Sequence, residues 1–119
     1  MSTKKVCGNR TEWYNAVGQL HRLENPAIEW VDGSKEWFRN GERHRENGPA
    51  VEYVSGTKMW YQNGKCHRVD GPAISHYNGV EGWYLDGRKY SKEEHVLLAW
   101  DRLTQEQRDN IIFDQSDVN

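Results

Sequence analysis

Cysteine is scarce in this sequence. Cys7 and Cys66 are the only two among 119 residues, and they form no CxxC pair. Two thiols do not make a disulfide framework, and without CxxC pairs the sequence does not predict a zinc site. We therefore interpret both cysteines as unpaired thiols of a protein that resides in a reducing compartment.

The chain also lacks long apolar runs. No stretch approaches the roughly 18 apolar residues that a membrane-spanning helix needs. The opening segment, MSTKKVCGNR, lacks the apolar stretch of a signal peptide. Because this length is typical of one domain, we expect a single soluble domain, residues 1–119, in the cytoplasm and without membrane contact.

Positive charge is not in excess, since the net charge is -2 and the isoelectric point is near 6.2. Proteins that bind nucleic-acid backbone non-specifically are normally basic, because Lys and Arg displace counterions, so we expect no such binding here. The sequence also has no GxSxG elbow, phosphate-binding glycine loop, HExxH motif or Cys/His nucleophile pattern. We predict a protein that is not an enzyme and that uses no metal or cofactor.

Aliphatic residues are few as well. The mean hydropathy is -1.04, yet six Trp and six Tyr are present. A disordered chain would lack these aromatic residues. We therefore expect a thin core built largely from aromatic rings, each of which buries a large area.

The sequence does contain an internal repeat with a period of 23 residues. Its most visible marks are the pairs His21-Arg22, His44-Arg45 and His67-Arg68. Other positions keep the same register, namely Pro26, Pro49 and Pro72, Ala27, Ala50 and Ala73, Trp37, Trp60 and Trp83, and the pairs Asn40-Gly41, Asn63-Gly64 and Asp86-Gly87. A half unit over residues 13–18 precedes the first full unit. A period of this length indicates a repeat architecture.

The residue pattern within each unit predicts turns separated by short strands. The Asn-Gly and Asp-Gly pairs favour two-residue hairpin turns with positive φ. A second turn precedes each proline, and in the first unit we expect Asn25 to supply the positive φ. Runs rich in β-branched and aromatic residues predict strands at 27–31, 35–39, 51–54 and 58–62. The predicted fold is mainly β, a single-layer twisted antiparallel β-meander of 23-residue repeats over residues 11–90.

A helical pattern follows the repeats. The segment Ser91-Lys92-Glu93-Glu94 is a capping box, with Ser at the N-cap and Glu three residues later. Apolar residues then follow at helical spacing, namely Val96, Trp100, Leu103 and Ile111, with Leu97 and Ile112 beside them. We expect a C-terminal capping α-helix over residues 91–113, which covers the open end of the sheet, and a polar tail over 114–119.

The consensus HRxxGPAIxxxxGxxxWYxNG resembles MORN and MORN-like repeats. It is closer to a family of tandem HRxDGPA…WYxNG repeat proteins found mainly in bacteriophages and some bacteria. Residues 86–94 are similar to the NGKxYSxEEF ending of that family, with His95 in place of the aromatic residue. The resemblance covers about residues 13–95. It implies a binding or scaffolding module without catalytic residues, and a phage accessory protein that acts on host machinery.

The repeated histidines, His21, His44 and His67, raise the hypothesis of a metal site. Equivalent positions in successive units lie two or three strands apart, about 10–14 Å. Zinc needs nitrogen ligands about 2 Å from the ion, so these side chains do not share one metal. We predict structural imidazoles that bond to the backbone of an adjacent turn.

The repeated arginines allow two interpretations. In one, each guanidinium stacks on a Trp or pairs with a turn carboxylate such as Glu24 or Asp70. In the other, the row of arginines recognises phosphates or carboxylates of a partner. The repeated tryptophans likewise either form the core, as the lack of aliphatic residues favours, or stack nucleobases.

The aromatic residue after each repeated Trp alternates to the other face of its strand. We expect the rings on that face to be partly exposed and to bind a protein, since Tyr, Trp and Arg dominate interface hot spots. The candidate partner-binding residues are Trp30, Phe38, Tyr53, Tyr61, His76 and Tyr84, together with Arg22, Arg45 and Arg68.

Three functional hypotheses remain. The first is a non-catalytic protein-binding repeat protein of a phage, which inhibits a host defence complex such as a CRISPR effector (an anti-CRISPR). The second is a small-ligand binder that sequesters a nucleotide signal. The third is a structural or assembly protein that associates along an open sheet edge. The protein is expected to be a monomer or a homodimer.

Overall fold

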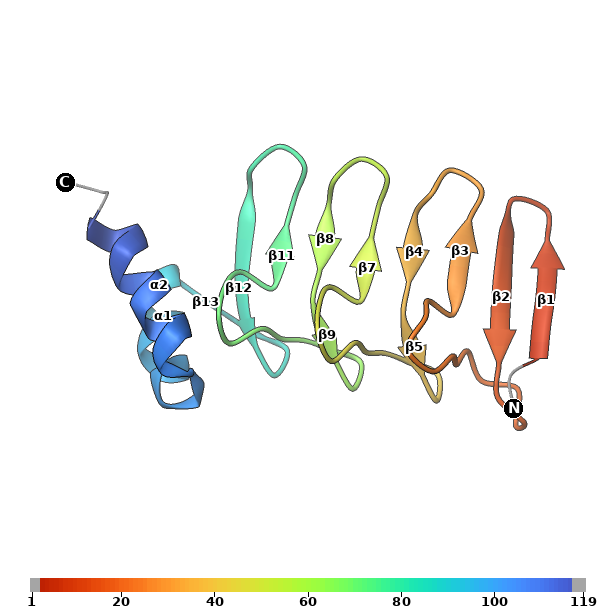
Figure 1. The fold of residues 1–119 in the computed structure, drawn as a ribbon, viewed down its shortest axis with the longest axis horizontal. Helices are drawn as coiled ribbons and strands as arrows, with labels where there is room; N and C mark the ends of the chain where they lie inside the picture. Colours follow the sequence, from red (N-terminus) through yellow and green to blue (C-terminus); the bar gives the residue numbers. More distant parts are fainter. Residues whose placement is uncertain (1–2, 117–119) are drawn as a thin grey trace.

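The computed structural model of the chain describes residues 3–116, and their side chains up to residue 111 (Figure 1). The chain is elongated, with extents of 51 × 28 × 23 Å. Hairpins stand side by side along the long axis in chain order, and helices lie at the C-terminal end (Figure 1). This arrangement confirms the predicted single-layer antiparallel β-meander with a helical cap.

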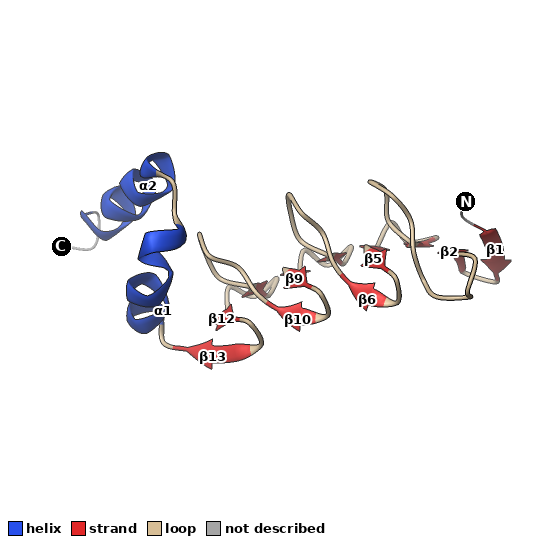
Figure 2. Ribbon diagram, turned by 90° about the horizontal axis from the view of Figure 1, so that it is seen from below, coloured by secondary structure: helices blue, strands red, loops and turns tan. Residues whose placement is uncertain are grey.

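The main sheet is antiparallel and has nine strands in the order β1-β2-β3-β4-β7-β8-β11-β12-β13. Their bounds are β1 Thr3–Cys7, β2 Arg10–Tyr14, β3 Ile28–Trp30, β4 Lys35–Glu36, β7 Val51–Glu52, β8 Lys58–Met59, β11 Ile74–Ser75, β12 Glu81–Leu85 and β13 Arg88–Tyr90. Two short hairpins lie beside it, with bounds β5 Phe38–Arg39, β6 Glu42–Arg43, β9 Tyr61–Gln62 and β10 Lys65–Cys66. Seen from below, β6, β10 and β13 form a row along one side of the molecule (Figure 2).

The runs predicted as strands over 35–39 and 58–62 are each divided at their Trp. Trp37 donates its backbone N–H to Ala50 O at 2.7 Å, and its carbonyl accepts from His44 N at 3.1 Å. Trp60 makes the same two bonds to Ala73 and His67. The chain therefore changes its pairing partner at each of these residues, leaving the main sheet and entering a short hairpin.

The hairpin turns have the predicted conformation. Asn40, Asn63 and Asp86 have φ of 48°, 50° and 51°, and the glycine after each is also positive. The prediction for Asn25 is wrong, because the positive φ in that turn belongs to Glu24, at 65°. In this turn of the first unit, Asn25 N bonds to Leu23 O at 2.8 Å.

The core is thin, and most of its buried apolar side chains are aliphatic. Ala27, Ala50 and Ala73 are fully buried at the repeat position after proline, and Ile28 and Val51 are buried next to two of them. Trp37 is the one buried Trp, Tyr or Phe ring among the described residues, whereas Trp60 and Trp83 are half-buried. The expectation of a core built largely from aromatic rings is therefore wrong, because a single layer leaves most of the large rings partly in solvent.

The C-terminal segment contains two α-helices rather than the single helix expected over 91–113. They are α1 (Lys92–Ala99) and α2 (Gln105–Ser116), joined by the 3-10 turn η1 (Trp100–Arg102). Thr104 starts α2 with a second capping box, since its Oγ1 accepts from Gln107 N at 3.1 Å and Gln107 Oε1 accepts from Thr104 N at 2.8 Å. The break follows from this capping chemistry.

The cap of α1 confirms the box predicted at its start, where Ser91 Oγ accepts from Glu94 N and Glu94 Oε1 accepts from Ser91 N. Within α1, His95, Val96 and Ala99 are buried, and the helix packs on β12 and β13. Residues 114–116 of the expected polar tail belong to α2, and residues 117–119 and the side chain of Ile112 lie outside the described part. Across residues 3–116, neither helix has the length and apolar character needed to cross a membrane.

Candidate protein-binding surface

The repeated histidines bond to the hairpin turn that ends their own unit. His21 Nδ1 accepts from Asn40 N at 3.0 Å, and His44 and His67 accept from the N–H groups of Asn63 and Asp86, both at 2.9 Å. Each imidazole thus satisfies the backbone of the turn 19 residues later. The predicted structural role is confirmed, and the residues described here contain no cluster of His, Cys, Asp and Glu that could hold a metal ion.

The repeated arginines lie on one side of the sheet, which we call the arginine face. Each guanidinium stacks on a Trp ring. The distances from Arg Cζ to the ring centroid are 3.8 Å for Arg22 on Trp13, 3.7 Å for Arg45 on Trp37 and 3.9 Å for Arg68 on Trp60. Each Nη1 also donates to the carbonyl of the following repeat proline. The interpretation of these arginines as scaffold therefore accounts for their recurrence.

The carboxylate partners of these arginines differ between units. Arg22 pairs with Glu29 at 3.0 Å and Arg45 with Glu52 at 2.7 Å, both from the neighbouring strand. In the third unit Ser75 stands at the strand position, and Arg68 pairs instead with Asp70 of the turn at 3.0 Å. The turn carboxylate expected for the first unit, Glu24, has no such pair among the described residues.

A tight approach explains the glycine before proline in two units. A Cβ on Gly71 would lie 2.7 Å from Arg68 Cζ, and one on Gly48 would lie 3.1 Å from Arg45 Cζ. Each guanidinium is therefore held between a Trp ring and the backbone of this glycine. The residue type at this position is set by close packing as much as by turn conformation.

The other side of the sheet carries the six predicted aromatic and imidazole side chains, and we call it the aromatic face. Register and strand alternation place them together. Ile28 and Val51 both pair with Glu36, so these three side chains lie on one side of the sheet. Trp30 and Tyr53, two positions further along their strands, point to the same side. All six are exposed or half-buried. They form two rows, Trp30, Tyr53 and His76 in one, and Phe38, Tyr61 and Tyr84 in the other.

A partly buried ion pair lies between the two rows, in which Glu36 is buried and Arg43 is partly exposed. Arg43 Nη2 donates to Glu36 Oε1 at 3.0 Å, and Trp30 Nε1 donates to the other oxygen at 3.3 Å. The Arg43 guanidinium lies 5.4 Å from the Tyr61 ring and 6.0 Å from the Phe38 ring. Burial lowers the pKa of Arg43, but the hydrogen bond and charge of Glu36 outweigh it, and the pKa is raised.

A second carboxylate, Glu12, is buried on the same face near the N-terminal edge. Its pKa is lowered mainly by the hydrogen bond from the Tyr14 hydroxyl, with smaller contributions from Cys7 and Arg10. Arg10 Nε pairs with it at 2.8 Å, and the Arg10 guanidinium lies 5.1 Å from the Trp30 ring. Cation and ring therefore alternate along the aromatic face.

Glu12 and Glu36 were not among the residues that the sequence predicted for this surface. Both precede a repeated Trp, where the later units have Met59 and Gly82. At Gly82 the missing side chain leaves room for a ring, since a Cβ there would lie 2.9 Å from Tyr84 Cε1. The sequence signal that could have revealed them is the variation at this one repeat position, from Glu in the first units to Met59 and Gly82 in the later ones.

The thiols offer little reactivity. Burial raises the pKa of Cys66 to about 11, so its thiolate is scarce at neutral pH. Cys7 donates to Glu12 at 3.5 Å. Neither cysteine is placed for nucleophilic chemistry by a neighbouring imidazole in the described part of the chain.

No family model, curated protein or solved structure matches the chain. The resemblance to MORN-like repeats of phages and bacteria thus stays a prediction from the motifs alone. The properties of this surface carry the functional argument.

Proposed function

We propose that this chain is a non-catalytic protein-binding repeat protein that docks on a host protein through its aromatic face. The observation that carries the proposal is the gathering of Trp30, Tyr53, Phe38 and Tyr61 around the Arg43–Glu36 pair on one side of a single-layer sheet. Tyr, Trp and Arg are the residues that most often dominate binding energy at interfaces. The pre-formed ion pair also holds Arg43 in place, which lowers the entropy cost of binding.

The concrete form that we favour is a phage accessory protein that inhibits a host defence complex such as a CRISPR effector. The motif resemblance supports the phage origin, and the net charge of -2 suits a basic, nucleic-acid-binding partner. The nucleotide-binding alternative has less support, because the three repeated arginines already stack on rings and pair with carboxylates.

The test is an affinity capture from bacterial lysate and from purified effector complexes, comparing the parent chain with Tyr61→Ala. Enrichment of a host protein or complex is expected with the parent chain and is expected to fall at least about tenfold with Tyr61→Ala, as for a hot-spot tyrosine. Lys35→Ala serves as the matched control, because this exposed residue lies next to Glu36 on the strand and faces the other side. Equal capture by the parent chain and Tyr61→Ala contradicts the proposal.

A further inference from the structure

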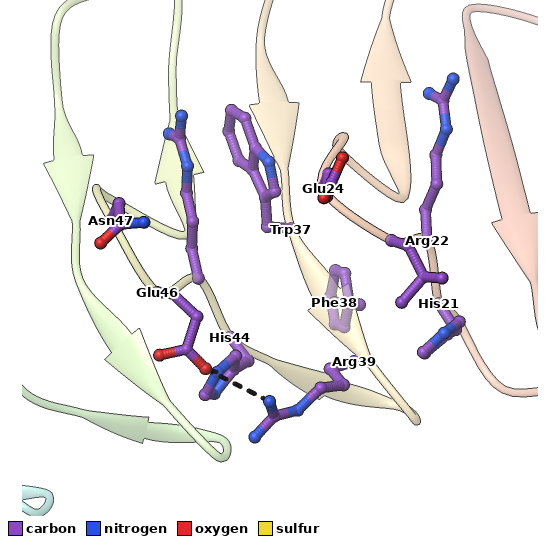
Figure 3. A pocket seen from close by; sticks show the side chains of 11 residues that line it. His21, Arg22, Glu24, Trp37, Phe38, Arg39, His44, Glu46 and Asn47 are labelled. Atoms are coloured by element: carbon purple, nitrogen blue, oxygen red, sulfur yellow. Dashed lines mark hydrogen bonds and ion pairs between the residues drawn. The ribbon is translucent and has the colours of Figure 1, made fainter.

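The arginine face contains two grooves that are repeats of each other. The first, of about 510 Å³, lies between loops 21–24 and 44–47 with Trp37 at its base. Figure 3 shows His21, Arg22 and Glu24 on one side of it and His44, Glu46 and Asn47 on the other. The second, of about 590 Å³, lies between loops 46–48 and 67–70 with Trp60 at its base.

The equivalence of the two grooves is close. All residues that line the second groove, except Gly48 and Gln107, lie 23 positions after a residue that lines the first. Glu46 and Asn47 line both, so their loop is the ridge between two copies of one site. A pair of equivalent sites in register is a feature that a ligand with its own repeat can use.

The helical cap ends this series. At the next repeat position Trp83 is covered by His95, whose ring centroid lies 5.0 Å away, and by Lys92 Nζ at 5.6 Å. Gln107 Nε2 of α2 donates to Asp70 Oδ2 at 3.2 Å, which places α2 at the outer wall of the second groove. The cap therefore closes the series beyond the second groove.

The electrostatics of the grooves point to an uncharged ligand. Every arginine that lines them is already paired with a carboxylate, namely Arg22 with Glu29, Arg39 with Glu46, Arg45 with Glu52 and Arg68 with Asp70. Their guanidinium groups still hold unused N–H donors, as do the amides of Asn47 and Gln62, since a guanidinium has five and an amide two. Paired charges and spare donors complement a neutral chain rich in hydrogen-bond acceptors.

The spacing of the grooves selects the conformation of that chain. One unit contributes two strands to the main sheet, so equivalent points lie about 9.4–9.8 Å apart. A polyproline II chain presents every third residue on one side at about 9.3 Å. A β-strand covers that distance in three residues, but its third neighbour points to the opposite side. An α-helix repeats its face only at about 10.5 Å after seven residues, and its carbonyls are already bonded internally.

We propose that these two grooves bind a proline-rich segment in the polyproline II conformation, with residues three positions apart entering successive grooves. Proline lacks an N–H, so such a segment offers only carbonyl acceptors, and these meet the free guanidinium and amide donors of the groove walls. Its pyrrolidine rings pack on the apolar side chains that line the grooves, which are Leu23 and Phe38 in the first groove and Val69 and the half-buried Trp60 in the second. The first groove shares Phe38 with the proposed host-protein surface, whereas Tyr61 lines neither groove, so a change at Tyr61 separates the two sites.

The test is calorimetric titration of the full chain with a ten-residue polyproline peptide, a three-residue one and a ten-residue Gly-Ser peptide. The long peptide spans both grooves at about 31 Å, whereas the short one reaches only one. Occupying the second groove in an intramolecular step predicts roughly tenfold or more tighter binding of the long peptide. No binding is expected for the Gly-Ser peptide, because it is flexible in solution and would lose much more backbone conformational entropy on binding.

Two variants locate the site. Asn47→Trp fills both grooves from the shared ridge and is expected to lower the affinity for the long peptide at least about tenfold, whereas Leu23→Trp blocks only the first groove and is expected to reduce it to that of the short peptide. Ser55→Trp, at an exposed turn on the same unit, is the control and is expected to bind as the parent chain. Tyr61→Ala on the aromatic face is also expected to bind normally, which separates this site from the proposed function.

Several results overturn the proposal. They are no heat with the long peptide at millimolar concentration, equal affinities of the long and short peptides, tighter binding of a helical Glu-Ala-Ala-Ala-Lys repeat peptide, or unchanged binding by both blocking variants. Since the Leu23 side chain is 73% exposed, replacing it disturbs little packing, and Leu23→Trp keeps the test decisive even where Asn47→Trp does not fold.

Discussion

At the scale of single residues, the repeat is held together by contacts within and between units. Each repeated histidine accepts a hydrogen bond from the N–H of the hairpin turn 19 residues later, which ends its own unit. Each repeated arginine lies between a Trp ring and the backbone while its charge is paired. A planar guanidinium can stack and donate in its own plane simultaneously, which an ammonium group cannot do.

This geometry predicts the effect of a conservative change at Arg45. Arg45→Lys keeps the charge but loses the stacking on Trp37. It also loses one of the two hydrogen bonds that Arg45 donates, to Pro49 O and to Glu52. We expect the free energy of unfolding, measured by urea denaturation, to fall by about 1–2 kcal/mol. Arg39→Lys, whose pair with Glu46 is mostly exposed, is the control and is expected to change it by less than about 0.5 kcal/mol. Equal losses in the two variants would contradict the structural role of the stack.

At the scale of elements, α1 takes over the contacts of a missing fourth unit. In the earlier units an arginine from the following loop covers each repeated Trp, whereas Trp83 is covered by Lys92 and His95. His95 is fully buried, and its Nε2 donates to the carbonyl of Arg68. The helix thereby closes the stack with a cation and an imidazole, the same residue types that the repeat uses.

The burial of His95 predicts that the cap is sensitive to acid. Burial lowers the pKa of His95 below its ordinary value of 6.5, although its hydrogen bond to Arg68 O acts in the opposite direction. Burial lowers the pKa of His67 as well. In the unfolded chain these imidazoles take up a proton at higher pH than in the folded one. The contribution of these neutral imidazoles to the free energy of unfolding is therefore fully present above about pH 6.5. It is lost as the pH falls from there toward the lower pKa of the folded state.

Chemical denaturation at several pH values between about 7.5 and 4.5 measures this effect. His95→Phe keeps a ring against Trp83 and removes one titrating group, so its stability is expected to depend less steeply on pH than that of the parent chain. The loss of the bond to Arg68 O is expected to lower its stability at pH 7.5. A slope unchanged by His95→Phe would show that the buried imidazole does not link protonation to folding.

At the scale of the whole molecule, an open single-layer sheet has two ends. The C-terminal end is covered by α1, whereas the outer side of β1 has no partner strand among the described residues. β1 carries Lys4 and Lys5, both exposed, and charged residues on an edge strand oppose pairing with another chain. This edge therefore disfavours the hypothesis of assembly along the sheet.

The edge lysines give a prediction about oligomeric state. We expect light scattering to report a monomer for the parent chain across a wide concentration range. The variant Lys4→Val/Lys5→Val presents a longer β-branched edge beside exposed Val6, and it is expected to associate as the concentration rises. Lys35→Val/Lys58→Val, at exposed positions of the inner strands β4 and β8, is the control for the loss of two charges. A parent chain that forms dimers through β1 would reverse this conclusion.

Much of the fold and part of the surface follow from local sequence. The Asn-Gly and Asp-Gly pairs take positive φ as predicted, and Ser91 caps its helix as predicted, because these depend on residues within four positions. Alternation along strands predicts which rings share a face for the same reason. The prediction for Asn25 was wrong because the positive φ falls on Glu24, a residue type for which local sequence does not favour that conformation.

The sequence by itself determined the 23-residue period, the meander and the presence of a helical cap, because turn chemistry and periodicity act over short range. The tertiary structure alone decided which carboxylate each arginine pairs with, where strands change partner at Trp37 and Trp60, and how Glu36 and Arg43 join two rows of rings. These contacts depend on how neighbouring units pack. Each joins residues that are far apart in the sequence or compete for the same partner, and folding alone brings them together. The two equivalent grooves belong to this second group, since they exist only between units.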